Sequence, residues 1–486
     1  MNHRMRSLKI NAALNGLRQG LNFLYPLITF PYVSRVLSIE SVGIYNFSNT
    51  YINYFMLLAA LGISTYAVRE GAKYRDNKIK INKFVNEIFT INILSTLLAY
   101  FLLIVTLIIF NNLHVYVLCI LIFSIQIMFT TIGTEWVYTI YEDYTYITIR
   151  SIIFKLLSIV MLFLFVRQKN DYLAYSFVTV FATVGSNLLN FFHLKTYFSI
   201  AIIRKINFKK HIKPILTIFF STMAVTLYVS SDITILGLFK SNYAVGIYSI
   251  ATKIYTIIVQ LIAAVIIVTI PRLAMLYGLQ RKVEYKKILG SLLNLILLII
   301  IPAAIGLILF SKEVVTIIGG TKYLNSSIPL NILAVTMIFS ILNTIVSECV
   351  LIPSKREKKL FFVNLFVGIF NVIFNIVLIP QWSYIAAACT TFLSESMSLV
   401  LNTANSWDIL NDILKSQNVY RNIIHSIVGS IGVIIVCLIM KELFFNKVIL
   451  MLMAIILSAL VYVLILIIMH NQIVRTNITK LVEKIK

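Results

Sequence analysis

The sequence predicts an all-α membrane protein with about fourteen transmembrane helices, and three observations support this fold class. The 486-residue chain is 59% hydrophobic and only 12% charged, whereas a soluble protein of this size needs more charge on its surface. Apolar runs of about 20 residues recur along the chain, each long enough to cross the hydrocarbon core as a helix. The runs are continuous, not the short alternating segments of a spanning β-barrel.

The predicted spans follow one another with short loops between them. They are 10–33, 42–67, 84–110, 113–138, 147–166, 172–195, 212–238, 243–270, 288–310, 325–352, 360–379, 383–404, 422–440 and 447–469. The basic start of the chain resembles a signal peptide, but asparagines interrupt its apolar core, so we expect an uncleaved first span. An even number of spans places both termini on the same side of the membrane.

The distribution of Lys and Arg predicts which side that is. Basic residues concentrate on the side of the N-terminus, in the segments 69–83, 195–213, 272–287 and 355–359 and in the tail after Met469. The positive-inside rule therefore predicts that both termini are cytoplasmic. The net charge of +24 is spread over these loops and not over one folded face, which argues against nucleic-acid binding.

Motifs for catalysis and for cofactors are missing from the sequence. There is no phosphate-binding GxxxxGK[ST] loop, no HExxH and no GxSxG, so we expect neither an enzyme nor ATP hydrolysis by this chain. The four cysteines lie inside apolar runs without a CxxC pair, which predicts no metal site and no disulfide. We therefore expect no cofactor.

A short internal repeat predicts how the helices are grouped. Val42-Gly43-Ile44-Tyr45 recurs as Val245-Gly246-Ile247-Tyr248, each time at the start of the second helix of a six-helix set. Six is even, so both sets share one orientation and a pseudo-two-fold axis along the membrane normal relates them. We expect six-helix lobes at 1–203 and 204–406, followed by the last two helices and a tail at 407–486.

Polar residues at helical spacing lie on single faces of several predicted spans. In the first two spans they include Asn22, Asn49 and Asn53. Similar faces occur in the seventh, eighth and tenth to twelfth spans. They either hydrogen-bond neighbouring helices or line a water-filled cavity. We favour a cavity lined by the first, second, seventh and eighth spans.

Charged residues within spans are costly and usually face a cavity or a partner. The cationic candidates for substrate binding are Arg18, Lys155 and Lys253, with Arg35 and Arg272 near the two mouths of the cavity. Arg150 is interpreted as a span-end cation and as the nearest partner of Glu142. The acids in the spans either pair with bases or couple transport to an ion gradient; these are Glu135, Asp232, Glu348 and Glu395.

Several motifs in this order resemble bacterial polysaccharide flippases of the Wzx type. The resemblance rests on Pro26-Leu-Ile-Thr-Phe-Pro-Tyr-Val-Ser-Arg35, both copies of the repeat, Tyr66-Ala-Val-Arg69-Glu70, Glu135-Trp136, Lys253 and Pro271-Arg272. It covers roughly residues 10–400. These flippases belong to a superfamily that also contains the multidrug MATE exporters and the lipid II flippase.

The resemblance implies a MATE-like fold of two lobes around a cationic cavity, in the plasma membrane of a bacterium. It implies that the chain flips undecaprenyl-diphosphate-linked oligosaccharide repeat units of O-antigen or capsule by alternating access. Three alternatives remain open: an antiporter of cationic drugs with the same fold, a membrane-embedded polysaccharide polymerase, and a scaffold in a polysaccharide-synthesis complex.

Overall fold

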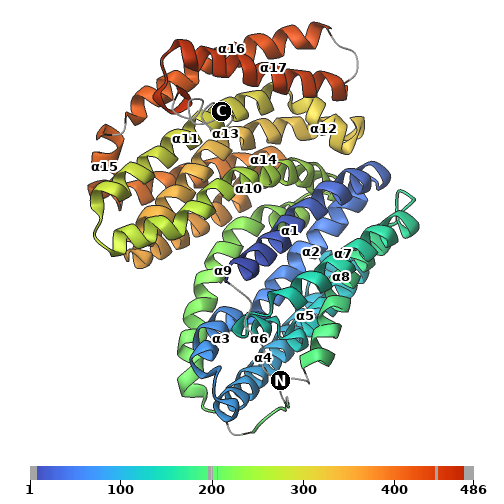
Figure 1. Ribbon diagram of the computed structural model, residues 1–486. Helices are drawn as coiled ribbons and strands as arrows, with labels where there is room; N and C mark the ends of the chain where they lie inside the picture. Colours follow the sequence, from blue (N-terminus) through green and yellow to red (C-terminus); the bar gives the residue numbers. More distant parts are fainter. Residues whose placement is uncertain are drawn as a thin grey trace. The chain divides into compact units, whose positions relative to one another are not determined.

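A computed structural model of the chain describes residues 8–194, 199, 201–204, 206–416, 418–443 and 447–475. All regular elements within these ranges are helical, which confirms the predicted fold class (Figure 1). The chain forms two compact units, Met1–Gly246 and Ile247–Lys486. These units are defined by contacts within the structure, whereas the predicted lobes are defined by the sequence repeat. The lobe boundaries therefore stay a prediction.

The first unit contains nine α-helices and the start of a tenth. They are α1 Leu8–Val36, α2 Ile39–Ala60, α3 Ile63–Gly71, α4 Lys78–Ile109, α5 Val117–Gly133, α6 Glu135–Ile140, α7 Tyr144–Phe165, α8 Tyr172–Leu194, α9 Phe208–Phe239 and α10 Asn242–Gly278. Short 3-10 helices cover Ala72–Tyr74 and Asn111–Tyr116.

The second unit continues from α10 with seven further α-helices. They are α11 Lys282–Leu309, α12 Ser311–Gly319, α13 Ser327–Thr344, α14 Glu357–Ala404, α15 Trp407–Ser416, α16 Val419–Leu443 and α17 Lys447–Ile468. A 3-10 helix covers Thr321–Ser326, and a π-helix at Ile345–Leu351 extends α13.

Side-chain caps explain where several helices begin. Ser38 accepts a hydrogen bond from the Ser41 backbone N–H at the start of α2. Asn77 does the same for α4, and Asp143 for α7. Each cap satisfies one of the four backbone donors that a helix start leaves unpaired.

The helices are long and apolar enough to span a membrane. Within the described residues, 11 helical segments meet this criterion, or up to 12 if the bent helix α9 counts as one span. Ser383 interrupts α14 with a φ of 52°, so this element contains two of the predicted spans. The chain is a multi-pass membrane protein, while the count of fourteen stays a prediction.

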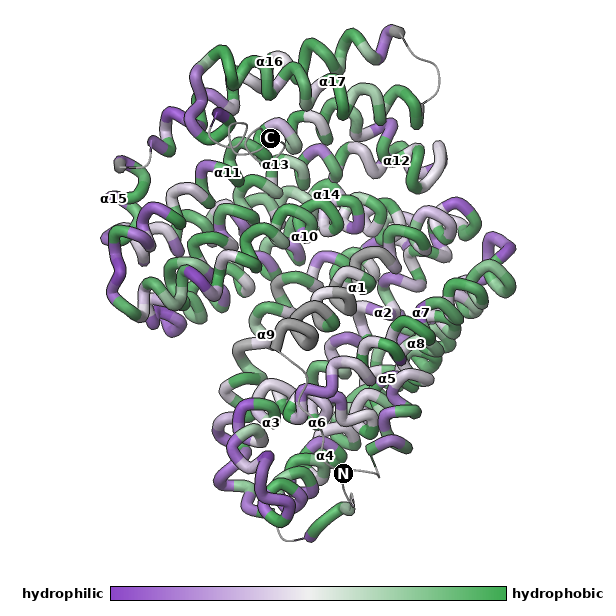
Figure 2. The backbone as a smooth tube through the Cα atoms, viewed as in Figure 1, coloured by the Kyte–Doolittle hydropathy of each residue, from purple (hydrophilic) through white to green (hydrophobic). Residues whose placement is uncertain are grey.

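Lipid-facing surfaces are evident on the last two helices. Figure 2 shows that α16 and α17 are hydrophobic along most of their length. Large apolar side chains such as Ile431 and Leu460 are more than half exposed. The hydrocarbon core of a membrane removes such apolar surfaces from water, so no further part of the protein has to cover them.

The repeated motif brings its own two copies together. A Cβ atom added to Gly43 would clash with the backbone of Asn242, just before the second copy. A Cβ atom added to Gly246 would clash with Ile39, at the equivalent place before the first copy. The two contacts are reciprocal, because each glycine meets the residue three positions before the other copy of the motif. The motif's glycines are therefore explained by close backbone approach.

Candidate functional site

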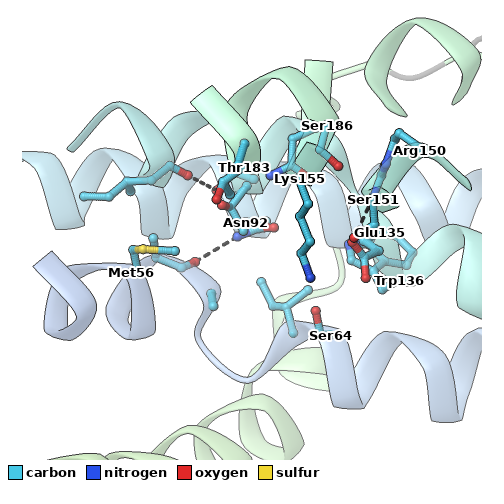
Figure 3. Close-up of a pocket in the computed structure, with 18 residues that line it drawn as sticks. Met56, Ser64, Asn92, Glu135, Trp136, Arg150, Ser151, Lys155, Thr183 and Ser186 are labelled. Carbon is cyan, nitrogen blue, oxygen red and sulfur yellow. Dashed lines mark hydrogen bonds and ion pairs between the residues drawn. The ribbon is translucent and has the colours of Figure 1, made fainter. Parts of the chain in front are cut away.

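A cavity of about 420 Å³ lies within the first unit. Figure 3 shows its side chains gathered between helices. Its walls come from α2 to α8. It is lined by Met56, Ala59, Ala60, Ile63, Ser64, Asn92, Ile127, Thr130, Thr131, Glu135, Trp136, Arg150, Ser151, Lys155, Ala182, Thr183, Ser186 and Asn187.

The first wall forms where one span is broken between α2 and α3. Leu61 and Gly62 at the break have φ angles of 47° and 73°. The carbonyl of Ala59 near this helix end accepts hydrogen bonds from Asn92 Nδ2 at 2.8 Å and Ser95 Oγ at 2.6 Å. Side chains of α4 therefore satisfy a backbone group that has no partner within its own helix.

The opposite wall forms at a second break, between α5 and α6. Thr134 adopts the left-handed conformation with a φ of 39°, which is uncommon for a β-branched residue. A Cβ atom on Gly133 would lie 2.7 Å from Asn187, so α5 and α8 are in close contact beside the break. The break turns Glu135 and Trp136 into the cavity wall, and broken helices of this kind often surround transporter binding sites.

The charges of the cavity are two cations and one carboxylate among its lining residues. Arg150 Nη2 lies 3.3 Å from Glu135 Oε2, and the Arg150 side chain is only 4% exposed. Lys155, five residues further along α7, extends across the cavity toward the segment that carries Ser64 (Figure 3). Because Glu135 balances Arg150, the lining keeps one net positive charge.

Neutral donors and acceptors complete the lining. The indole Nε1 of Trp136 is buried and has no hydrogen-bond partner among the described residues. Hydroxyls of Ser64, Ser151 and Thr183 line the same space. An aromatic ring with a donor, several hydroxyls and a net positive charge can hold an anionic group together with polar hydroxyl-bearing groups.

The structure brings together two of the residues predicted for the site, Lys155 and Glu135, and corrects the interpretation of Arg150. This arginine is not a span-end cation and does not pair with Glu142, because it is buried against Glu135. Glu142 pairs with Arg75 instead, at 3.1 Å. The long Arg75 side chain reaches Glu142 from another loop, which spacing along the sequence does not reveal.

Other predicted site residues of the first unit lie outside this cavity. Arg35 is exposed at the end of α1. Asn49 is half-buried and Asn53 is exposed. Both lie on the face of α2 that continues to Met56 and the cavity. Arg18 and Asn22 belong to α1, but their side chains lie outside the described residues.

The remaining predicted residues are on later helices. Asp232 on α9 is buried, although its place near the outer end of the predicted seventh span is also compatible with exposure to water outside the membrane. Lys253 on α10 and Glu395 on α14 are half-buried. Arg272 is exposed on α10, and Glu348 is half-buried in the π-helix. The predicted lining by the first, second, seventh and eighth spans draws on both units and stays a prediction.

Polar stripes of the second unit form a set of buried hydrogen bonds instead. Asn371 donates to Ser394 Oγ at 3.2 Å and Asn375 to Asn371 Oδ1 at 3.0 Å. Asn402 donates to Asn343 Oδ1 at 2.9 Å. We call this set the polar ladder; its members are Asn343, Asn371, Asn375, Thr390, Ser394, Ser398 and Asn402. All except Asn343 are buried.

Sequence reasoning missed Trp136 as a lining residue, together with Asn92 and Asn187. The available signals were two glycines, Gly62 and Gly133, inside apolar spans. An isolated glycine within a helical pattern often marks a break or a close contact. Both spans were predicted as continuous, so the wall residues beside the breaks were not recognised.

Comparisons with known proteins give the family context. The family model described as "Polysaccharide biosynthesis protein" matches residues 8–277. A protein of Escherichia coli (strain K12) that carries the name O-antigen transporter is 25% identical over 402 residues, covering 82% of this chain and 96% of that protein.

Two solved structures share the fold. The lipid II flippase MurJ, in an inward closed conformation, superposes with a TM-score of 0.74 at 15% identity, covering 96% of this chain and 99% of that one. An inward-facing multidrug resistance MATE family transporter superposes with a TM-score of 0.62 at 13% identity, covering 82% of this chain and 99% of that one. These similarities confirm the MATE-like fold.

Proposed function

The chain belongs to the polysaccharide biosynthesis protein family, and we propose that it flips undecaprenyl-diphosphate-linked oligosaccharide repeat units across the plasma membrane. The finished polymer would be a surface polysaccharide of the O-antigen or capsule kind. The E. coli relative is named for O-antigen transport, which supports this substrate class. The chain would be a carrier and not an enzyme.

The observation that carries the proposal is the charged, polar cavity at the two helix breaks. A diphosphate is anionic and needs cationic donors, which Lys155 and Arg150 supply. Sugars need hydroxyls, amides and an aromatic ring, and Trp136, Asn92 and Ser64 supply these. The polyprenyl chain can remain in the bilayer, since its burial needs no protein groups.

The predicted topology places this cavity where loading would begin. With both termini cytoplasmic, α7 enters the membrane from the cytoplasm and reaches Arg150 and then Lys155 within its first three turns. A headgroup arriving from the inner leaflet would meet these cations first. Rocking of two pseudo-two-fold lobes (1–203 and 204–406) would then expose it to the outside, with Lys253, Arg18, Arg35 and Arg272 along the route.

The energy source has two candidates. A proton or sodium gradient would act through acids within the spans, namely Asp232, Glu348, Glu395 or Glu135. Alternatively, consumption of the repeat unit outside would pull the flow downhill. In the second case the partners include a polysaccharide polymerase and other export proteins. Collapsing the gradient in reconstituted vesicles separates the two.

The strongest rival is an antiporter of cationic drugs, because the fold alone is shared with a multidrug transporter. The net positive lining of the cavity disfavours cationic cargo. Drug susceptibility of an overexpressing strain tests this rival directly. The polymerase and scaffold alternatives predict that export survives changes confined to the cavity.

Deleting the gene and reconstituting the protein test the proposal together. Lipid-linked repeat units should accumulate on the inner leaflet of the deletion strain. Proteoliposomes with the wild-type chain should move a labelled undecaprenyl-diphosphate oligosaccharide between leaflets, and protein-free vesicles should not. Normal surface polymer in the deletion strain would contradict the proposed function.

A further inference from the structure

A second polar pocket lies in the other unit, at the end of the membrane-spanning helices α11 and α16. Its volume is about 240 Å³. It is lined by Ser291, Asn294, Asn418, Arg421, Asn422, His425, Gln472 and Ile473. Among these lining residues there is one arginine and no carboxylate. Neither the family membership nor the proposed transport requires this pocket.

Hydrogen bonds to helix backbones hold the walls of this pocket in place. Ser426 Oγ donates to the Leu297 carbonyl at 3.2 Å, and Tyr462 Oη donates to the Leu298 carbonyl at 2.8 Å. The first bond joins α16 to α11, and the second joins α17 to α11. The arrangement of polar groups around the pocket is therefore built into the packing of three helices.

Asn471 fixes the orientation of the groups at the back of the pocket. This side chain is only 1% exposed, and its Oδ1 accepts the backbone N–H of Ile473 at 3.1 Å. Its Nδ2 therefore points the other way and donates to Asn422 Oδ1 at 2.8 Å and to His425 Nδ1 at 3.0 Å. His425 Nδ1 must accept this bond, so it carries no proton.

The neutral imidazole of His425 then has its proton on Nε2. Arg421 Nε, which is also a donor, lies 3.4 Å from that nitrogen. A direct bond from Arg421 to His425 would need the opposite tautomer, which the Asn471 amide opposes. Two N–H groups thus compete in this contact, and an oxygen acceptor that both reach from the side of the pocket would satisfy both.

The electrostatic setting favours an acceptor that carries negative charge. Arg421 supplies a permanent cation with further N–H donors. The pocket lies at the start of α16, whose first residue is Val419, and the partial positive charge of a helix N-terminus adds to that of the arginine. A tetrahedral oxyanion can accept from Arg421, from His425 and from the amides of the lining at once.

We propose that this pocket binds a phosphate group, supplied by the headgroup of an anionic membrane phospholipid. Beside the pocket, Tyr420 and Ile424 on α16 are more than half exposed, in a chain whose apolar surfaces face lipid. A phospholipid could place its phosphate in the pocket, within reach of Arg421 and His425, and lay its acyl chains along α16. Inorganic phosphate has the same recognition chemistry without the acyl chains, so the test must separate the two.

Native mass spectrometry of the full-length protein in detergent, titrated with phosphatidylglycerol, measures the proposed binding. Arg421→Gln should weaken phosphatidylglycerol binding about 10- to 100-fold, the effect of losing a charged hydrogen bond of about 1.5–3 kcal/mol. Lys415→Gln, which removes an exposed cation of α15 outside the lining, should leave the binding unchanged. Equal binding by both variants would overturn the proposal.

A second variant keeps the fold and cancels the positive charge of the lining. Asn422→Asp still accepts the hydrogen bond from Asn471, so its thermal unfolding should match wild type, while its carboxylate should repel the phosphate. Inorganic phosphate should compete weakly with phosphatidylglycerol at the wild-type site. If inorganic phosphate binds in an Arg421-dependent way and phosphatidylglycerol does not, the lipid assignment is overturned. Wild-type binding by Asn422→Asp would overturn the site itself.

Discussion

The cavity of the first unit and the polar ladder of the second unit come from the same sequence signal. Both arise from polar residues at helical spacing in apolar spans. The cavity sits at two helix breaks and contains Arg150, Lys155 and Glu135. The ladder contains neutral amides and hydroxyls that bond one another, and all of them except Asn343 are buried. Because α14 is also interrupted, at Ser383 within the ladder, the charged side chains of the lining, and not the helix breaks alone, distinguish the cavity from the ladder.

The largest effect should come from removing the positive charge of Lys155 from the cavity. Lys155→Gln should lower transport of the labelled lipid-linked oligosaccharide about 10- to 100-fold, because one charged hydrogen bond to the diphosphate is lost. Transport in proteoliposomes and surface polymer in cells both report it. Lys169→Gln, an exposed loop lysine, is the matched control. Unchanged transport by Lys155→Gln would show that transport does not depend on this charge in the cavity.

The helix break itself should be intolerant of a side chain. Gly62→Ala places a Cβ atom 2.8 Å from Ile218 at a φ of 73°, so we expect a destabilisation of about 1–3 kcal/mol. Gly278→Ala is the control, because a Cβ atom at that position meets nothing within 4 Å. Thermal unfolding in one detergent compares the two. Equal stability of both variants would show that the break does not depend on glycine.

Ladder variants should lose stability before they lose transport. Asn375→Ala leaves Asn371 and Thr390 without their buried partner, which should cost about 1–3 kcal/mol. Asn53→Ala, on the exposed face of α2, should cost little. Unfolding curves and transport per folded molecule separate the two properties. A transport defect in folded Asn375→Ala would give the ladder a role in the transport cycle.

Hydrophobic runs and loop charge predicted the helical membrane fold, since twenty-residue apolar segments have few other solutions. They could not predict the breaks at Gly62 and Thr134, because neighbouring helices stabilise these conformations. Within the candidate site, the energetic cost of placing a charged side chain inside the membrane singled out Lys155 and Glu135. It missed Trp136 and Asn92, which look like ordinary span residues until the breaks turn them toward the cavity. The partner of Arg150 also depended on packing and not on spacing.

The smallest expected effect is the pH dependence of stability near the polar ladder. The polar ladder has no titratable member, but Arg356 at the nearby end of α14 pairs with Asp408 on α15 and donates to the Asn405 carbonyl at 2.7 Å. Hydrogen bonding from the guanidinium lowers the pKa of the Asp408 carboxyl. The folded state therefore gains stability above the unfolded pKa of about 3.9, and loses it as pH falls through the lowered folded value.

Because the Asp408 side chain is 60% exposed, this gain should not exceed about 1 kcal/mol. Asp408→Asn should be less stable than wild type at pH 7, and the difference should shrink as the pH falls toward the lowered pKa. The penalty of Asn375→Ala should stay constant over the same range, since no ladder member titrates. Thermal unfolding from pH 7 to pH 3 measures both differences. If the loss of stability in Asn375→Ala varied with pH, a charged group would be acting on the ladder. The contrast between a neutral ladder and a charged cavity would then be wrong.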